Sequence, residues 1–153
     1  MYDGLLRDMR SLVAGVDESA VGILANAAAL IFERTGWFWV GFYMVDGEVL
    51  KLGPFQGPVA CYRIGFGRGV CGTAWKRGET VVVPDVEAFP GHIACSSLSR
   101  SEIVVPLFGN GTVIGVLDID SREYDEFDDT DKVYLEQICE LLSEVLKRCP
   151  YRA

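Results

Sequence analysis

The spacing of hydrophobic positions predicts helices near both ends of the chain. Across residues 17–34, apolar side chains recur every three or four positions and so share one face of a helix. We expect Asp17 to cap the start of this helix and Gly36 to end it. A short helix is also predicted at residues 5–13, and a long one at residues 128–147.

Hydrophobic runs between these helices predict β-strands. Residues 37–45 and 48–52 flank an Asp46-Gly47 turn, which is a strong signal for a hairpin. The first of these strands is apolar on both faces, so we expect it inside a sheet and covered on both sides. A second hairpin is predicted at residues 103–108 and 112–120, and the shorter elements in between are a strand at 59–64, a helix at 70–76 and a strand at 80–83.

This order of elements predicts an α+β fold, with a central antiparallel sheet and helices packed on it. A chain of 153 residues, half of them hydrophobic, fits a single domain that spans residues 1–153. The longest uncharged run, residues 103–117, is interrupted by glycines and is too short to span a membrane. The first residues do not form a secretory signal, so we expect a soluble, cytoplasmic protein.

Charge and cysteine content narrow the function. The net charge is −8, and no basic stripe of the kind that binds nucleic acids is visible. Five cysteines, an odd number without a secretion signal, favour reduced thiols in the cytosol over a disulfide framework. We expect Cys139 in the core of the last helix and Cys149 exposed near the C-terminus. The remaining three, Cys61, Cys71 and Cys95, lie in segments with turn or loop signals and are candidates for chemistry.

Each of these three cysteines has a different predicted setting. Cys61 lies in the predicted strand 59–64, and Cys95 lies on a long loop. Cys71 lies at the start of a predicted helix, where the helix dipole lowers the pKa of a thiol. His92 could serve Cys95 as a base or join a zinc site, but the sequence offers neither a clear orienting partner nor a tight cysteine pair. We therefore expect no metal.

A group of carboxylates is the second candidate for chemistry. Asp118 and Asp120 are two residues apart on a predicted strand and so share one face, roughly 6.5–7 Å apart. If residues 109–111 form a three-residue turn, Glu102 lies opposite Asp118; a two-residue turn points Glu102 to the other face. Three acids on one face repel, so at least one should have a raised pKa and could donate a proton. Such a cluster also suits a metal or a substrate ammonium group.

Six segments carry these candidates in a distinctive order: residues 37–43, 60–64 (Ala-Cys-Tyr-Arg-Ile), 69–74 (Gly-Val-Cys-Gly-Thr-Ala), 90–95 (Pro-Gly-His-Ile-Ala-Cys), 101–107 (Ser-Glu-Ile-Val-Val-Pro-Leu) and 117–121 (Leu-Asp-Ile-Asp-Ser). Their order closely resembles that of the free methionine-(R)-sulfoxide reductases, which are stand-alone GAF domains. The resemblance covers about residues 15–146. It implies a GAF-like fold and an oxidoreductase that reduces the free L-methionine (R)-S-oxide to methionine.

The resemblance also implies roles for the cysteines. Cys95 matches the nucleophile, with Cys71 as a rival, and Cys61 and Cys71 match the resolving positions. Cys95 would become a sulfenic acid and then a disulfide, which a thioredoxin-like dithiol would reset. No cofactor is needed for this chemistry. The sequence departs from the family at Ser96, where the family usually carries Asp.

For the acidic residues, the resemblance implies a substrate pocket. Glu102, Asp118 and Asp120 match its carboxylates, and Trp39 matches an aromatic wall for the S-methyl group. Glu102 is the first candidate for the acid that protonates the sulfoxide oxygen. The alternative function is a non-catalytic GAF sensor of a small ligand or of redox state. We keep a homodimer as a candidate oligomeric state.

Overall fold

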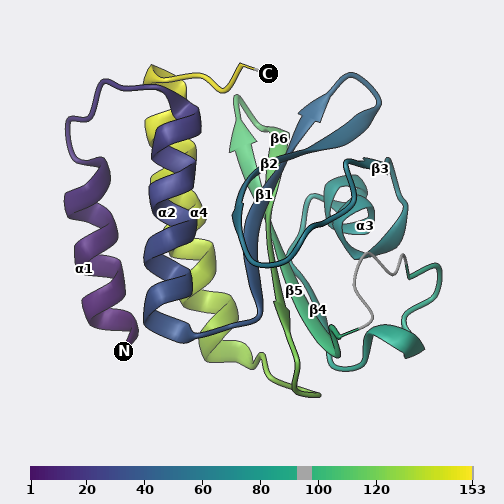
Figure 1. Cartoon of the computed structure of the whole chain (residues 1–153). Helices are drawn as coiled ribbons and strands as arrows, with labels where there is room; N and C mark the ends of the chain where they lie inside the picture. Colours follow the sequence, from purple (N-terminus) through teal and green to yellow (C-terminus); the bar gives the residue numbers. More distant parts are fainter. Residues whose placement is uncertain (93–97, 153) are drawn as a thin grey trace.

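The computed structural model describes residues 1–92 and 98–152, and it arranges them as a sheet with helices on both of its faces (Figure 1). Helices α2 (Ala20–Thr35) and α4 (Asp129–Arg148) pack on one face of the sheet, and α1 (Tyr2–Val13) packs on the outer side of these two helices. The sheet has six strands, and the short helix α3 (Gly69–Arg77) packs on its other face. Within the described ranges, no helix has the length and apolar character that a membrane span requires.

The strands follow the order β3-β2-β1-β6-β5-β4, and all neighbouring pairs are antiparallel. Their bounds are β1 (Trp39–Asp46), β2 (Val49–Gln56), β3 (Arg63–Gly65), β4 (Val81–Val83), β5 (Ser101–Gly109) and β6 (Thr112–Ser121). A one-turn 3-10 helix, η1 (Val86–Ala88), follows β4. This architecture confirms the predicted α+β fold, and β1 lies inside the sheet as predicted.

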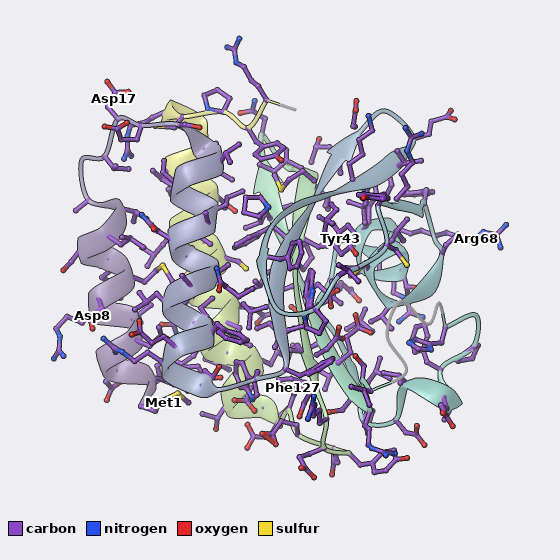
Figure 2. The ribbon with its side chains drawn as sticks, viewed as in Figure 1. Met1, Asp8, Asp17, Tyr43, Arg68 and Phe127 are labelled. Carbon is purple, nitrogen blue, oxygen red and sulfur yellow. The ribbon has the colours of Figure 1, made fainter. Side chains whose placement is uncertain are left out.

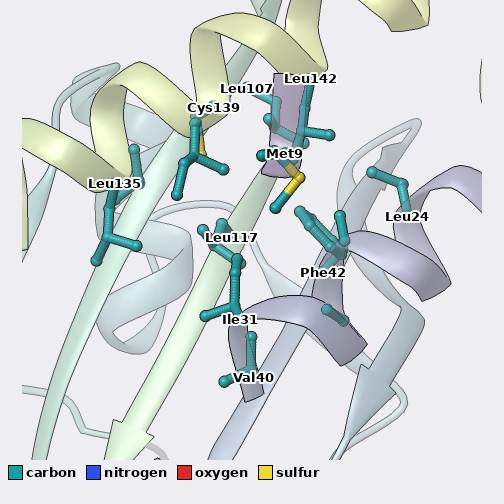
Figure 3. Packing of buried hydrophobic residues seen from close by; sticks show 14 of the residues in the cluster. Met9, Leu24, Ile31, Val40, Phe42, Leu107, Leu117, Leu135, Cys139 and Leu142 are labelled. Carbon is teal, nitrogen blue, oxygen red and sulfur yellow. The ribbon is translucent and has the colours of Figure 1, made fainter. Parts of the chain in front are cut away.

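Side chains of β1 alternate between two hydrophobic cores, as expected for a strand covered on both sides. Val40 and Phe42 face the side of α2 and α4, whereas Trp39 and Tyr43 belong to the smaller core on the α3 side. Figure 3 shows the larger core, in which Cys139 of α4 lies among aliphatic side chains. The core position predicted for Cys139 is therefore confirmed.

The prediction that Cys149 is exposed is wrong. Its side chain is only 6% exposed and belongs to the same core cluster. Cys149 caps the C-terminus of α4, and its backbone N–H donates to the Val145 carbonyl at 2.9 Å. Its Sγ lies 3.6 Å from the carbonyl oxygen of Val16, so the loop between α1 and α2 covers the end of the helix.

Two helix starts differ from the prediction. Helix α2 begins after Ser19, whose side chain accepts a backbone N–H at 3.2 Å, so Ser19 and not Asp17 is the N-cap. Gly36 ends this helix in the left-handed conformation (φ 68°), as predicted. Helix α1 begins at Tyr2, three residues earlier than predicted, because the Tyr2 ring stacks on Tyr134 of α4 with centroids 4.8 Å apart.

The predicted strand at residues 59–64 is mostly a loop. Strand β2 continues to Gln56, and residues 57–62 then form a loop before the short strand β3. Gly57 has a φ of 136° and Pro58 lacks a backbone N–H, so these two residues end the pairing. Cys61 therefore lies in a loop and not in a strand, and its carbonyl accepts the Tyr43 hydroxyl at 2.9 Å.

The β5–β6 hairpin has a register that neither sequence alternative predicted. Asn110 (φ 53°) and Gly111 (φ 76°) form a two-residue turn, which should have pointed Glu102 to the other face. A β-bulge at Ile114 adds one residue to β6 and reverses that change. Glu102 consequently pairs with Asp120, and it faces the same side as both aspartates of β6.

Candidate active site

Three neighbouring strands place the predicted site residues in one row on the α3 side of the sheet. Trp39 of β1 pairs with Asp120 of β6, which in turn pairs with Glu102 of β5. Asp118 lies in the adjacent row, opposite Gly41 of β1. A Cβ atom at Gly41 would lie 2.6 Å from the Trp39 ring, so the glycine allows the indole to lie across the strand.

The indole of Trp39 is fixed by its surroundings. Its Nε1 donates a hydrogen bond of 3.0 Å to the Pro58 carbonyl. Its ring stacks on Phe55 and on Tyr43, with centroid distances of 5.1 and 5.9 Å. Trp39 is 4% exposed, so this arrangement presents a rigid aromatic surface beside the carboxylates.

A partly open cavity of about 50 Å³ lies over this row of residues. Its aromatic and aliphatic walls include Phe38, Trp39, Val59 and Val70. Its polar lining consists of Tyr43, Cys71, His92, Ser99, Glu102, Asp118 and Asp120. An apolar pocket with a few converging polar groups is the usual form of a small-molecule site.

Burial raises the pKa values of the three carboxyl groups, and mutual repulsion adds to the effect on Glu102 and Asp120. Desolvation raises the pKa of Glu102 well above its usual range, and the charges of Asp118 and Asp120 raise it further. Desolvation also raises the pKa of Asp120 well above its usual range, and that of Asp118. Hydrogen bonds from the Glu102 carboxyl and the Cys71 thiol partly offset the effect on Asp118. The predicted rise in pKa is therefore found for all three carboxyl groups, and hydrogen bonds from Glu102 and Cys71 make the charged form of Asp118 less unfavourable.

One oxygen of this cluster lacks a partner among the described residues. Asp118 Oδ1 is buried and receives no hydrogen bond there. An unpaired buried carboxylate oxygen is costly, so a donor on a ligand would stabilise it. The Cys71 thiol and one carboxylate oxygen each of Glu102 and Asp118 lie within 4.8 Å of one another. This set could accept an ammonium group or ligate a metal ion through one sulfur and two oxygens.

Cys71 lies at the predicted place but with the opposite shift in pKa. It is in the first turn of α3, near the N-terminus of the helix, as expected. Complete burial raises its pKa well above the usual range, and the charges of Asp118, Glu102 and Asp120 raise it further. The helix dipole acts weakly against these effects, so the predicted fall in pKa is wrong. Cys71 is therefore a protonated thiol that donates to Asp118.

Of the other two candidate cysteines, only Cys61 lies within the described residues. Cys95 and Ser96 lie outside the described residues, and so does the suggested pairing of Cys95 with His92. Cys61 is half-buried in the loop 57–62 and is disulfide-bonded, whereas Cys71, Cys139 and Cys149 carry free thiols.

Sequence reasoning missed three residues of the site: Gly41, Tyr43 and Ser99. The first two were detectable, because alternation along β1 places residues 39, 41 and 43 on one face. Burial, followed by the negative charge of Asp118, raises the pKa of Tyr43, so its hydroxyl stays protonated and donates to the Cys61 carbonyl. Ser99 lies in a loop, where no periodic pattern could identify it.

Comparison with known proteins places this geometry in a family. A family model described as "GAF domain" matches residues 15–147. The chain is 47% identical to the free methionine-R-sulfoxide reductase of Escherichia coli, over 99% of this chain and 92% of the relative. It is 56% identical to GAF domain-containing protein A of Dictyostelium discoideum, over 92% and 89% of the two chains.

A solved structure shows the same fold. The free methionine-R-sulfoxide reductase of Neisseria meningitidis, in complex with its substrate, matches with a TM-score of 0.93 and 56% identity. The match covers 97% of this chain and 89% of that one. The chain therefore belongs to the GAF-domain family of the free methionine-R-sulfoxide reductases.

Proposed function

We propose that this protein is a free methionine-(R)-sulfoxide reductase, acting as a single domain on the free amino acid. The observation that carries the proposal is the buried Asp118 Oδ1, which has no hydrogen-bond partner among residues 1–92 and 98–152 and lies at a cavity that Trp39 lines. The α-ammonium of an amino acid would donate to this oxygen and neutralise the surrounding carboxylates. An S-methyl group would then lie against the indole, which is the type of surface that apolar groups contact.

The acid cluster supports the first chemical step. The thiolate of Cys95 attacks the sulfoxide sulfur, and the protonated carboxyl of Glu102 supplies a proton to the sulfoxide oxygen. Methionine is released, and the oxygen remains on Cys95 as a sulfenic acid. The raised pKa of Glu102 supports this role, because a general acid must hold its proton near the working pH.

The contrast between the other two cysteines supports Cys61 as the resolving residue. Cys71 is buried, its pKa is raised, and its thiol donates to Asp118, all of which oppose nucleophilic attack. Cys61 lies on a half-exposed loop and is disulfide-bonded. Its thiol would condense with the Cys95 sulfenic acid and release water. A thioredoxin-like dithiol in the cytoplasm would then reduce the disulfide, without metal or organic cofactor.

The test is turnover of purified methionine sulfoxides with dithiothreitol as the reductant. We expect release of methionine from the free R isomer, and at least a hundredfold lower kcat/KM for the S isomer and for N-acetylated substrate. Binding of the free amino acid without release of methionine would contradict the proposal and support the GAF sensor. Equal turnover of free and N-acetylated forms would show that the carboxylates do not recognise the ammonium.

A further inference from the structure

The charge of the chain is distributed unevenly around Cys61. Residues 47–78 carry five Lys or Arg side chains and one Glu, a formal charge of +4. The other 121 residues carry −12. The basic segment forms β2, β3 and α3, so an otherwise acidic protein concentrates positive charge on the elements next to this cysteine.

Four cations of this segment are exposed, and three of them, Arg63, Arg68 and Lys76, define what we call the basic face. The stems of Arg68 and Lys76 lie over the turn between β3 and α3, because they would contact Cβ atoms built at Gly65 and Gly67 at 3.2 and 3.3 Å. Figure 2 shows Arg68 pointing away from the molecule beside α3. None of the three cations forms an ion pair with another described residue, so their charge is available to a partner.

Exposed apolar side chains adjoin the same face. Val59 and Tyr62 flank Cys61 in the loop and are 88% and 82% exposed, more than any other large hydrophobic residue described. Phe66 is 53% exposed, and its ring meets Trp75 edge to face at 4.8 Å. Apolar contacts with a charged rim are the usual composition of a protein–protein interface.

Cys61 lies at the boundary between the apolar and charged residues. It is two residues from Val59 and two from Arg63, so each Cα lies within about 7 Å of the Cα of Cys61. A reductant that reaches the sulfur of Cys61 must therefore contact these neighbours. For this reason, the charge of the basic face acts on any charged protein that reduces Cys61.

We propose that the basic face and the apolar loop around Cys61 form the docking surface for an acidic protein dithiol. This inference rests on the proposed function, in which Cys61 and Cys95 form a disulfide. A thiolate of the partner attacks Cys61 Sγ, the bond to Cys95 breaks, and Cys95 leaves as a thiolate. The second partner thiol attacks the mixed disulfide, and its proton goes to the departing Cys61. The partner therefore ends as a disulfide, and this protein ends with a thiol at Cys61 and a thiolate at Cys95.

The test measures disulfide reduction directly. Protein oxidised with diamide is mixed with an acidic thioredoxin in a stopped-flow instrument, and the second-order rate is compared with that for dithiothreitol, which is uncharged. We expect Arg63→Glu/Arg68→Glu to lower the thioredoxin rate about tenfold or more at low salt, and the difference to shrink as salt rises. The dithiothreitol rate should not change.

Two further variants serve as a charge-matched control and as a test of the apolar loop. Arg7→Glu/Arg10→Glu reverses the same number of charges on α1, on the opposite side of the sheet (Figure 1), and should change the thioredoxin rate less than twofold. Tyr62→Ser should lower that rate several-fold without changing its salt dependence. Equal thioredoxin rates for both charge-reversed pairs, or equal slowing with thioredoxin and dithiothreitol, would overturn the proposal. These rates need no sulfoxide, so a lack of methionine release would contradict the proposed function alone.

Discussion

At the scale of single residues, the site divides one set of carboxyl groups into two chemical roles. Glu102 is 7% exposed, and burial keeps it protonated as a potential donor. Asp118 is equally buried, but it accepts hydrogen bonds from Glu102 and from Cys71, which favour its charged form. In the proposed mechanism, these neighbouring acids with different environments would supply both a proton donor and an anionic site for a substrate cation.

Replacing Asp118 should weaken recognition of the ammonium group of the substrate. We expect Asp118→Asn to lower kcat/KM for the free sulfoxide about tenfold to a hundredfold, because a charge-assisted hydrogen bond contributes about 1.5–3 kcal/mol. The preference for free over N-acetylated substrate should fall by the same factor. Glu79→Gln, an exposed position, is the matched control. An unchanged preference would show that Asp118 does not contact the ammonium.

The buried carboxyls should also make stability fall with rising pH. The pKa of Glu102 is raised in the folded state, so its stabilising effect is complete below the unfolded value, 4.5, and is lost as pH rises toward the folded value. Glu102→Gln cannot ionise. The difference in unfolding free energy, variant minus wild type, should therefore become more positive between pH 5 and pH 8. Urea unfolding at several pH values measures this difference, and parallel curves for the two proteins would contradict the argument.

At the scale of elements, the sequence predicted which segments pair but not how they align. Hydrophobic runs identified both hairpins and the central place of β1 because these features depend on local patterns. The bulge at Ile114 has no such pattern, yet it decides the face on which Glu102 lies. The loop around Cys61 and the burial of Cys149 likewise depend on tertiary contacts. The match to a family placed Glu102, Asp118, Asp120 and Trp39 in one pocket, and all four line the cavity, whereas the register argument did not predict the pairing of Glu102 with Asp120.

The close packing of β1 under the site should make Gly41 sensitive to one added methyl group. In Gly41→Ala, the new Cβ would lie 2.3 Å from the Phe55 Cβ and 2.6 Å from the Trp39 ring, so the indole must move. We expect a loss of about 1–3 kcal/mol in stability and a higher KM. Gly22→Ala on α2 meets nothing within 4 Å and should stabilise the protein by about 0.5–1 kcal/mol without affecting KM. Thermal unfolding and steady-state kinetics distinguish the two, and an unchanged KM in Gly41→Ala would contradict the packing argument.

At the scale of the whole molecule, the larger hydrophobic core and the candidate active site lie on opposite faces of the sheet. Helices α2 and α4 cover one face of the sheet, with α1 packed outside them, and the three helices contribute to the larger core. The carboxylates, Trp39 and Cys71 lie on the other face of the sheet (Figure 1). Along each central strand, core residues alternate with residues of the site. The rigid sheet therefore holds the site, while the helices bury most of the apolar surface. Changes on the two faces should therefore have separable effects.

Removal of metal ions should leave the activity of the enzyme unchanged. A metal ion bound to Cys71, Glu102 and Asp118 would occupy the place that we assign to the ammonium group. We expect substoichiometric zinc in the purified protein by elemental analysis, and full activity after treatment with a chelator. Added zinc should inhibit competitively with the free sulfoxide, and Cys71→Ala should reduce this inhibition. Activity that disappears on chelation and returns with zinc would refute the metal-free mechanism.

Substitutions of Cys139 and Cys149 test whether changes in the larger core affect stability without affecting activity. Cys139 and Cys149 are 3% and 6% exposed in the core between the sheet and the helices, so Cys139→Ala/Cys149→Ala should cost about 0.5–3 kcal/mol per site in unfolding free energy. Its kcat/KM should stay within twofold of wild type, because both thiols lie outside the cavity.

Cys95→Ser should behave in the opposite way, with a wild-type Tm and no detectable turnover, since a hydroxyl cannot form the sulfenic acid. Steady-state activity close to wild type in Cys95→Ser would instead make Cys71 the nucleophile, despite its raised pKa.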